Sequence, residues 1–429
     1  MSARGNLRWA IVALLFAATA ISYIDRQTLS IVAPVLREEL GISNVGYAQI
    51  LSAFLFSYTV MQAATGWLID RLGTRKGFAI IMAWWSVAAI LHAFGDGVVS
   101  FAIYRFLLGA GEAGSWAACV KAVSEWFPPE ERGFANSLWA AGVSAGQVLS
   151  VPLVAWITVT MDWRYSFIVT GLFGFVWLLA WLRIYRKPDR LPGEKALSAD
   201  DFRQRQNAGH VERIPYLSLL RSRNVWAIFL ARVLADPCIW FYNYWIPEYL
   251  KSVGYSMVDI GKYGWIPFLT MGIGILAGGV LSDFLCRREM RTVPARFAVM
   301  AVGALLMVPG VLAAFELPAG MIFLAISVAT LGFGLWAPNM MTLHADAFPN
   351  QVVGSVTGLG GVGAGLGGIA FTMWTGWMVD NFGFGLVFLA AGIIPLLAFA
   401  VLYLLFDRKL ADDIASGRVT TLFPAKKGA

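Results

Sequence analysis

The chain has 429 residues, of which 58% are hydrophobic and only 14% are charged, and its mean hydropathy is +0.66. A soluble protein of this length needs more polar surface, so the composition excludes a soluble globular protein and indicates a polytopic membrane protein. The formal net charge is +7, but the cations stand in short loops beside apolar segments, which indicates membrane orientation and not nucleic-acid binding.

Twelve apolar stretches follow one another along the chain, and each reaches the roughly 17–25 residues that a spanning helix needs. Because lipid offers the backbone no hydrogen-bond partner, we expect each stretch to be a helix. The first stretch follows two arginines and resembles a signal peptide, but its length and the spans directly after it predict an uncleaved helix. The expected limits are 9–36, 45–69, 77–95, 99–124, 134–158, 165–186, 223–250, 260–285, 294–315, 320–344, 353–378 and 383–406.

The orientation follows from the loop cations. Lys and Arg residues follow the second and eighth helices and flank the end of the fourth, whereas the links after the third, ninth and eleventh contain none. Both termini are therefore predicted to be cytoplasmic. The link at residues 344–351 breaks the pattern, since it lacks Lys and Arg as well.

A polar, basic segment separates two sets of six predicted helices. We interpret it as a cytoplasmic linker between two six-helix halves. The predicted parts are an N-terminal half at 1–186, the linker at 187–222, a C-terminal half at 223–406 and a cytoplasmic tail at 407–429.

A loop is repeated in the two halves, after the second and the eighth helices. Gly66 and Asp70 recur in step as Gly279 and Asp283, and basic residues follow each pair. Glycine lets helix backbones approach, and the aspartate can cap a helix or pair with arginine, so the loop can lock helices together at the cytoplasmic side. Internal repetition of this kind is typical of secondary transporters, whose site lies between the halves. The residues of this predicted cytoplasmic gate are Gly66, Asp70, Arg71, Gly73, Arg75, Lys76, Asp283, Arg287 and Arg288.

The first copy of the loop, residues 66–76, resembles the loop of the major facilitator superfamily. The resemblance covers nearly the whole chain, because the twelve spans, the repeated loop and the long central linker all fit. It implies an all-α fold of twelve transmembrane helices in two pseudo-symmetric halves.

Four further motifs stand at Tyr23-Ile-Asp25-Arg26, 104–113, 125–128 and 163–167, and three more stand at 231–240, 243–247 and 342–349. The first four resemble motifs of the anion:cation symporter branch, which includes bacterial sugar-acid transporters and vesicular glutamate carriers. The other three are similar to motifs of the hexuronate transporters. The resemblance implies proton-coupled import of a hexuronate (galacturonate or glucuronate) or a related sugar acid through the bacterial inner membrane.

Asp25 and Arg26 stand inside the first predicted span and Arg105 and Glu112 inside the fourth, where a charge costs at least about 2.5 kcal/mol. Arg105 and Glu112 are two helical turns apart and face the same side. They are either part of a structural ion pair, within their helix or with the first helix, or Glu112 takes up a proton. Asp25 and Arg26 are adjacent and point about 100° apart, so we expect each to have a different neighbour. The resemblance implies proton coupling for Asp25 and carboxylate binding for Arg26, and we assign proton coupling to Asp25 and Glu112.

In the second half, Arg232 and Asp236 are one turn apart and can pair with each other, or Arg232 can be a second anchor for the anion. Pro237 predicts a kink or break in this helix. The glycine run at 358–368 indicates close helix packing or a moving segment and not a nucleotide loop. The predicted substrate-binding residues are Arg26, Tyr58, Arg105, Arg232, Tyr242, Asn243, Trp336 and Asn339, with packing as the alternative for the aromatic ones.

No pattern for an enzyme, a metal or a cofactor is visible, since the three cysteines and three histidines are scattered. The expected partners are a small organic anion, protons and the lipid bilayer, without nucleic acid, and the expected state is a monomer. Two alternatives remain open. One is another anion class, namely a dicarboxylate, an aromatic acid or a phosphate ester taken up by exchange. The other is a membrane sensor that does not transport.

Overall fold

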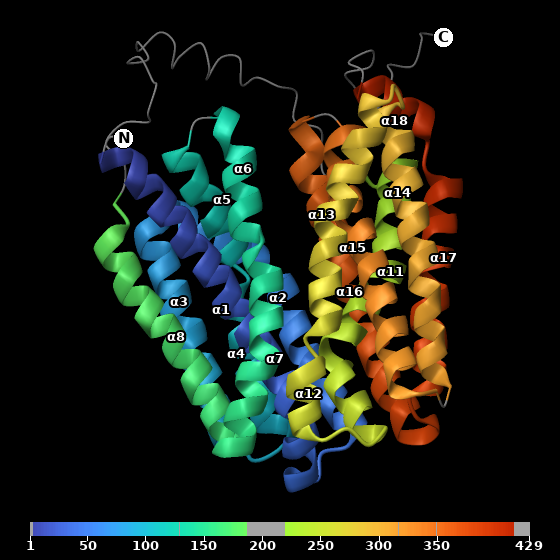
Figure 1. The fold of residues 1–429 in the computed structure, drawn as a ribbon. Coiled ribbons are helices and arrows are strands. Elements are labelled where there is room, and N and C mark those ends of the chain that lie inside the picture. Colours follow the sequence, from blue (N-terminus) through green and yellow to red (C-terminus); the bar gives the residue numbers. More distant parts are fainter. Residues whose placement is uncertain (1–2, 128, 187–218, 316, 349, 416–429) are drawn as a thin grey trace. The chain divides into compact units, whose positions relative to one another are not determined.

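The computed structural model describes residues 3–127, 129–186, 219–315, 317–348 and 350–415, and every regular element in these ranges is a helix (Figure 1). The all-α prediction is thus confirmed over the described residues. Most of the predicted linker and the end of the tail lie outside them.

The helices form two compact units. Unit 1 comprises Met1–Ala196, Tyr242–Phe268 and Thr372–Asn381, so it contains the first set of helices together with short pieces of the second. The sequence-based division at residues 187–222 stays a prediction. The elements of unit 1 are α1 (Ala3–Leu40), α2 (Asn44–Leu72), α3 (Thr74–Leu91), η1 (His92–Phe94), α4 (Val98–Glu112), α5 (Ser115–Trp126), α6 (Pro129–Ala140), α7 (Gly142–Thr160), α8 (Trp163–Ile184) and α12 (Met257–Tyr263).

Unit 2 comprises Leu197–Phe241, Leu269–Phe371 and Phe382–Ala429. Three of its helices continue into unit 1 at one end: α11 (Arg223–Ser252), α13 (Ile266–Arg287) and α16 (Asn350–Phe382). Its other elements are α14 (Thr292–Met307), η2 (Val308–Ala314), α15 (Ala319–Ala347), α17 (Gly385–Leu405) and α18 (Arg408–Ala415).

All twelve predicted stretches are helical, and ten helical segments of the described chain are long and apolar enough to cross a membrane. Three of the stretches are not continuous helices. The fifth is divided between α6 and α7 at residue 141, and the eighth is divided between α12 and α13 at residues 264–265. The fourth is divided after Glu112 into α4 and α5, because a turn at residues 113–114 interrupts the helical hydrogen bonds. The break places Glu112 at the end of a helix, where its side chain can reach neighbouring helices.

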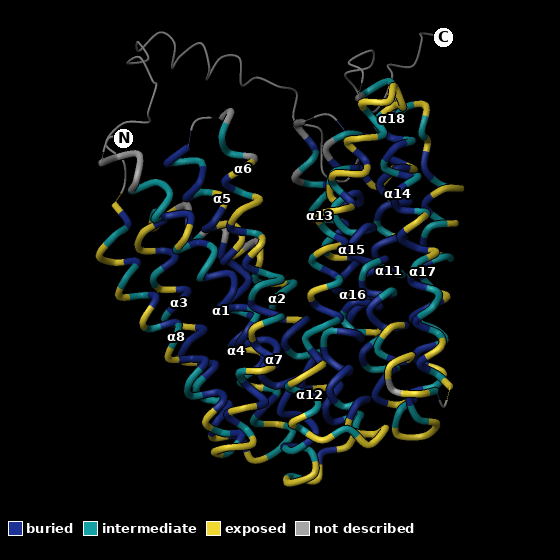
Figure 2. The backbone as a smooth tube through the Cα atoms, viewed as in Figure 1, coloured by how far each residue is buried: buried dark blue, intermediate teal, exposed yellow. Residues whose placement is uncertain are grey.

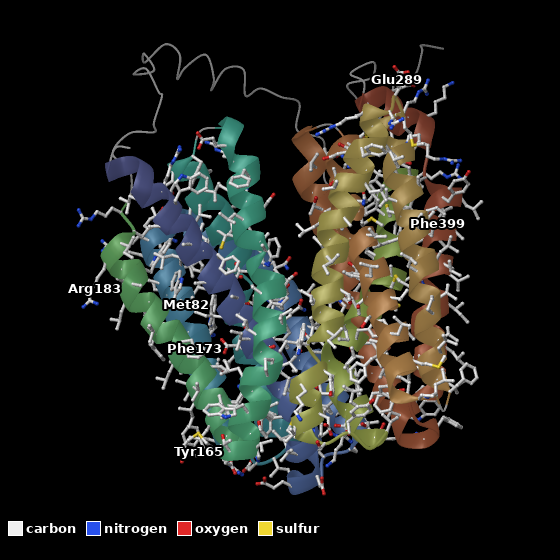
Figure 3. All side chains as sticks on the ribbon, viewed as in Figure 1. Met82, Tyr165, Phe173, Arg183, Glu289 and Phe399 are labelled. Atoms are coloured by element: carbon white, nitrogen blue, oxygen red, sulfur yellow. The ribbon has the colours of Figure 1, made fainter. Side chains whose placement is uncertain are left out.

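Glycines allow α4 to approach α2 closely. A Cβ on Gly109 would stand 2.6 Å from the carbonyl oxygen of Phe54 and 2.3 Å from Ser57 Oγ, so only glycine fits without a shift. Most of the middle part of α1 is buried, whereas α8 exposes one side (Figure 2). On the covered side of α8, Met82 of α3 lies next to Gly174, close to the labelled Phe173 (Figure 3).

The ends of α1, α2, α11 and α16 meet within unit 1, and we call these contacts the four-helix junction. Ser30 Oγ donates to the carbonyl oxygen of Tyr244 at 2.8 Å, and Tyr47 Oη donates to the same oxygen at 2.9 Å. Arg37 forms an ion pair with Glu248. These contacts join α1 and α2 to the end of α11 by hydrogen bonds and charge.

In unit 2, α16 packs tightly on α11 through its glycines. A Cβ on Gly367 would stand 2.2 Å from the carbonyl oxygen of Val233, and one on Gly363 would stand 2.9 Å from that of Phe229. The close packing predicted for the glycine run is therefore confirmed. Of the kink or break predicted at Pro237, the break is wrong, because α11 continues through this residue as one helix, and the kink stays a prediction.

Candidate functional site

The carboxylate of Glu112 pairs with Arg26 of α1. Arg26 Nε lies 2.5 Å from Glu112 Oε2, and Ser22 Oγ donates to the same oxygen at 2.9 Å. The side chain of Glu112 is fully buried and that of Arg26 is 7% exposed. The ion pair therefore joins α4 to α1, and it is not made within α4. Glu112 Oε1 has no hydrogen-bond partner among the described residues.

Three aromatic rings surround the guanidinium of Arg26. Its Cζ lies 4.6 Å from the ring centre of Tyr58, 4.8 Å from that of Tyr23 and 5.1 Å from that of Phe54. Cation–π contacts of this kind stabilise a charge that has left water. Tyr58 thus contacts Arg26 through its ring face.

Arg105 is buried without a carboxylate partner. Its Nη2 donates to the backbone oxygen of Arg26 at 3.3 Å, and no carboxylate of the described residues lies within 4.0 Å. Its Nε has no hydrogen-bond partner in the described part of the chain. An uncompensated guanidinium with an open donor is suited to binding an anion.

Asp25 lies in the same interior and is also unpaired. Neither of its carboxylate oxygens has a hydrogen-bond partner among the residues that the structure describes. The hydroxyl of Thr170 on α8 faces it but donates, at 3.5 Å, to the carbonyl oxygen of Phe167. Asp25 and Arg26 therefore have different neighbours, as their helical positions predict. A buried, unpaired carboxyl group is stable mainly in its neutral form.

Asn243 of α11 is held by an amide from another helix. Gln147 Nε2 of α7 donates to Asn243 Oδ1 at 3.1 Å, while the Oε1 atom of Gln147 has no partner in the described residues. Tyr242 is fully buried beside it on α11. Gln147 is not among the residues predicted from sequence, although a glutamine inside an apolar span was a visible signal.

In unit 2, Arg232 and Asp236 form the pair predicted from their spacing. Arg232 Nε lies 2.8 Å from Asp236 Oδ2, with side chains 11% and 12% exposed. The charge of Arg232 is thus largely balanced, in contrast to that of Arg105.

The structure does not bring Asn339 or Trp336 to Arg232. Asn339 Nδ2 donates to the carbonyl oxygens of Gly278 (3.1 Å) and Leu335 (2.9 Å), so its amide protons join α15 to α13. The ring of Trp336 packs edge-on against that of Phe399 of α17, with ring centres 6.4 Å apart. Figure 3 labels Phe399 on this helix. The roles of Asn339 and Trp336 in binding stay predictions.

The first copy of the gate loop turns at Gly73. This residue has φ +78°, a left-handed conformation that favours glycine, and its N–H donates to the carbonyl oxygen of Ile69 at 3.0 Å. Arg75 Nη2 donates to the carbonyl oxygen of Leu182 at 2.5 Å. Arg71 and Lys76 are exposed, whereas the exposure of Gly66 and the side chain of Asp70 lie outside the described part.

In the second copy, Asp283 pairs with Arg296, which was not predicted from the sequence. Arg296 of α14 lies 3.1 Å from Asp283 Oδ1 and 3.1 Å from Asp346 Oδ2 of α15, whereas Arg287 and Arg288 are exposed and make no ion pair in the described residues. Arg288 stacks instead on Phe284, with its Cζ 5.2 Å from the ring centre. Arg296 thus joins the ends of three helices.

Residues 15–372 match the family described as the Major Facilitator Superfamily. The chain is similar to the hexuronate transporter of Escherichia coli (strain K12), with 33% identity over 420 residues, which cover 96% of this chain and 96% of that protein. It is also similar to the galacturonate transporter of Dickeya chrysanthemi, with 32% identity over 323 residues, which cover 73% of this chain and 93% of that protein.

Solved structures have the same fold. A D-xylose–proton symporter has a TM-score of 0.73 at 17% identity, covering 94% of this chain and 99% of that chain. A bacterial homologue of the human lysosomal transporter Spinster, inward-facing and unoccupied, has a TM-score of 0.72 at 16% identity, covering 98% of this chain and 99% of that chain.

These matches agree with the helical units. The fold has twelve transmembrane helices, the family and the relatives are transporters and not enzymes, and the protein is a multi-pass protein of the bacterial inner membrane. The chain belongs to the major facilitator superfamily.

Proposed function

We propose that this protein imports a sugar acid, with a hexuronate as the first choice, together with protons and by alternating access. The observation that carries the proposal is the state of the two buried arginines in unit 1. Arg26 forms an ion pair with Glu112, whereas Arg105 has no carboxylate beside it in the described residues. The names of the hexuronate and galacturonate transporters support the choice of anion.

Arg105 is the primary anchor for the substrate carboxylate. A planar guanidinium can hold a carboxylate through two parallel hydrogen bonds, and Arg105 is 1% exposed with its Nε open. Arg26 becomes a second anchor when Glu112 releases it. Arg232, Tyr58, Tyr242, Asn243, Asn339 and Trp336 supply further contacts to the substrate.

Glu112 and Asp25 are the proton sites. Both hydrogen bonds to Glu112 reach Oε2, so Oε1 can receive a proton. A neutral Glu112 attracts Arg26 less, and the freed guanidinium can then bind the substrate anion. Asp25 is buried and neither of its carboxylate oxygens has a hydrogen-bond partner among the described residues, so a proton bound there removes a buried charge. Proton uptake and anion binding thus favour each other.

The test is uptake of radiolabelled D-galacturonate by purified full-length protein in proteoliposomes. An inside-alkaline pH gradient should drive accumulation above equilibrium, and a protonophore should abolish it. Uptake that reaches equilibrium but is the same with and without the pH gradient would overturn proton coupling. Exchange of phosphate esters without uptake of any sugar acid would overturn the substrate class.

A matched pair of arginine variants tests the anchor. Arg105→Lys keeps the charge but loses the planar guanidinium that can form two parallel hydrogen bonds to a carboxylate, so uptake should fall by at least about ten-fold. Arg183→Lys changes an exposed arginine at the end of α8 and should leave uptake unchanged (Figure 3). Equal uptake by the two variants would contradict the assignment of Arg105.

A further inference from the structure

His344 is a buried side chain with an unused acceptor. It lies on α15 and is 1% exposed. Its Nδ1 lies 2.7 Å from the carbonyl oxygen of Met340, and since a carbonyl only accepts, Nδ1 carries the hydrogen. In the neutral ring Nε2 is then an acceptor. This atom has no hydrogen-bond partner among the described residues.

Arg232 points at the same place from α11. On Gly360 of α16, a Cβ would stand 3.1 Å from His344 Nε2 and 3.2 Å from Arg232 Nη1. A side chain at Gly360 would therefore press on both atoms, so the two atoms lie near the same point beside α16. Because Arg232 meets Asp236 through Nε, its Nη1 group is free of that ion pair. One donor and one acceptor thus converge within unit 2.

The chemistry of this pair fits a hydroxyl group better than a carboxylate. A hydroxyl oxygen can accept from Arg232 while its hydrogen is donated to His344, whereas a carboxylate has nothing to donate. Asp236 also balances the charge of Arg232, so the pair attracts an anion less than Arg105 does.

We propose that His344 and Arg232, beside Gly360, form a site that binds one hydroxyl group of the sugar acid by hydrogen bonds. The proposal deepens and rests on the proposed function. It makes His344 a specificity-determining residue, which distinguishes a sugar acid from a deoxy acid of the same charge. Neither Asn339 nor Trp336 on the same helix is turned to this place.

The test is calorimetric binding of D-galacturonate and its 2-, 3- and 4-deoxy analogues to the purified full-length protein. For the wild type, one deoxy analogue should bind roughly five- to 100-fold more weakly, because a buried acceptor is left unpaired. In His344→Leu the penalty for that analogue should fall to within about two-fold, whereas His92→Leu, another buried histidine with an open Nε2, should keep it.

Glycine variants test the same place without touching the histidine. Gly360→Ala should reduce the penalty as well, because its methyl group occupies the space beside both atoms, whereas Gly358→Ala has nothing within 4 Å and should keep it. A penalty that persists unchanged in both His344→Leu and Gly360→Ala overturns the hydroxyl site alone. A wild-type protein that binds no uronate overturns the proposed function and the inference together.

Discussion

The carboxylate of Asp380 on α16 caps the first turn of α2 at Asn44. Asp380 Oδ1 accepts from the backbone N–H of Asn44 at 3.0 Å and from its side-chain Nδ2 at 2.7 Å, while Oδ2 accepts from Val45 N–H at 2.9 Å. The first N–H groups of a helix have no partner within the helix, and its N-terminus attracts negative charge. Ser43 is the N-cap of α2, since its hydroxyl accepts from the N–H of Gly46, and Asp380, a residue far along the chain, satisfies the N–H groups of Asn44 and Val45 in addition. Asp380 thus belongs to the four-helix junction.

Asp380→Asn should loosen this junction. The neutral amide loses the charge–dipole attraction and can offer only one acceptor atom, at a cost of about 0.5–1.5 kcal/mol. Hydrogen exchange at Asn44 and Val45 should therefore become several-fold faster. The matched control is Asp96→Asn, since Asp96 accepts a hydrogen bond from Ser100 at the start of α4 in the same unit. Unchanged exchange in the first turn of α2 would show that Asp380 does not hold it.

Glu112→Gln should separate transport from proton coupling. The amide has nearly the same shape but neither binds a proton nor balances Arg26, which is buried beside it. We expect exchange of unlabelled for labelled galacturonate to continue, because exchange needs no net proton movement, whereas gradient-driven accumulation is lost. Ser22→Ala, which removes only the neutral hydrogen bond to Glu112, should keep accumulation. Full uphill uptake by Glu112→Gln would disprove the assignment.

The sequence predicted the helices well because their signal is strong. In lipid an apolar stretch of sufficient length has no alternative to a helix, and all twelve stretches are helical. The divisions of the fourth, fifth and eighth stretches were missed, because glycines inside a span indicate close packing as readily as a break.

Partners in space were harder to predict than elements. The spacing of Arg232 and Asp236 is local, and their pairing was found. The pairing of Arg26 with Glu112 was only one of two alternatives, and that of Arg296 with Asp283 was missed, since both depend on how helices pack. His344 was not predicted as a site residue for the same reason. Its unpaired Nε2 can be recognised only from the positions of Met340 and Gly360 in the structure.

Two alanine variants of α16 should differ in stability according to what faces each glycine. In Gly367→Ala the new Cβ would lie 2.2 Å from the carbonyl oxygen of Val233, so α16 must move away from α11. We expect a loss of about 1–3 kcal/mol, which is typical of overpacking. Gly361→Ala meets nothing within 4 Å and should be neutral or slightly stabilising, because alanine is the better helix former. Thermal unfolding of both variants in the same detergent measures the difference, and equal melting temperatures would refute the close contact.

Tyr185, just beyond the end of α8, should make stability depend on alkaline pH. Burial, together with the hydrogen bond that it donates to Glu125, raises the pKa of Tyr185 well above its usual value. The group's stabilising contribution is therefore complete below the unfolded pKa of about 10, and it is lost as the pH rises beyond that value. A hydrogen bond to a charged acceptor contributes about 1.5–3 kcal/mol, so Tyr185→Phe should lower the melting temperature at pH 7.

The difference between the wild type and Tyr185→Phe should then shrink as the pH is raised from 10 to 11, because the wild type loses the contribution that the variant lacks. Tyr165→Phe is the control, since Tyr165 is exposed on the same helix (Figure 3). Its melting temperature should follow that of the wild type at neutral pH. A difference for Tyr185→Phe that stays constant up to pH 11 would show that the hydroxyl is not held by Glu125, since only a bonded and buried hydroxyl has this pH dependence.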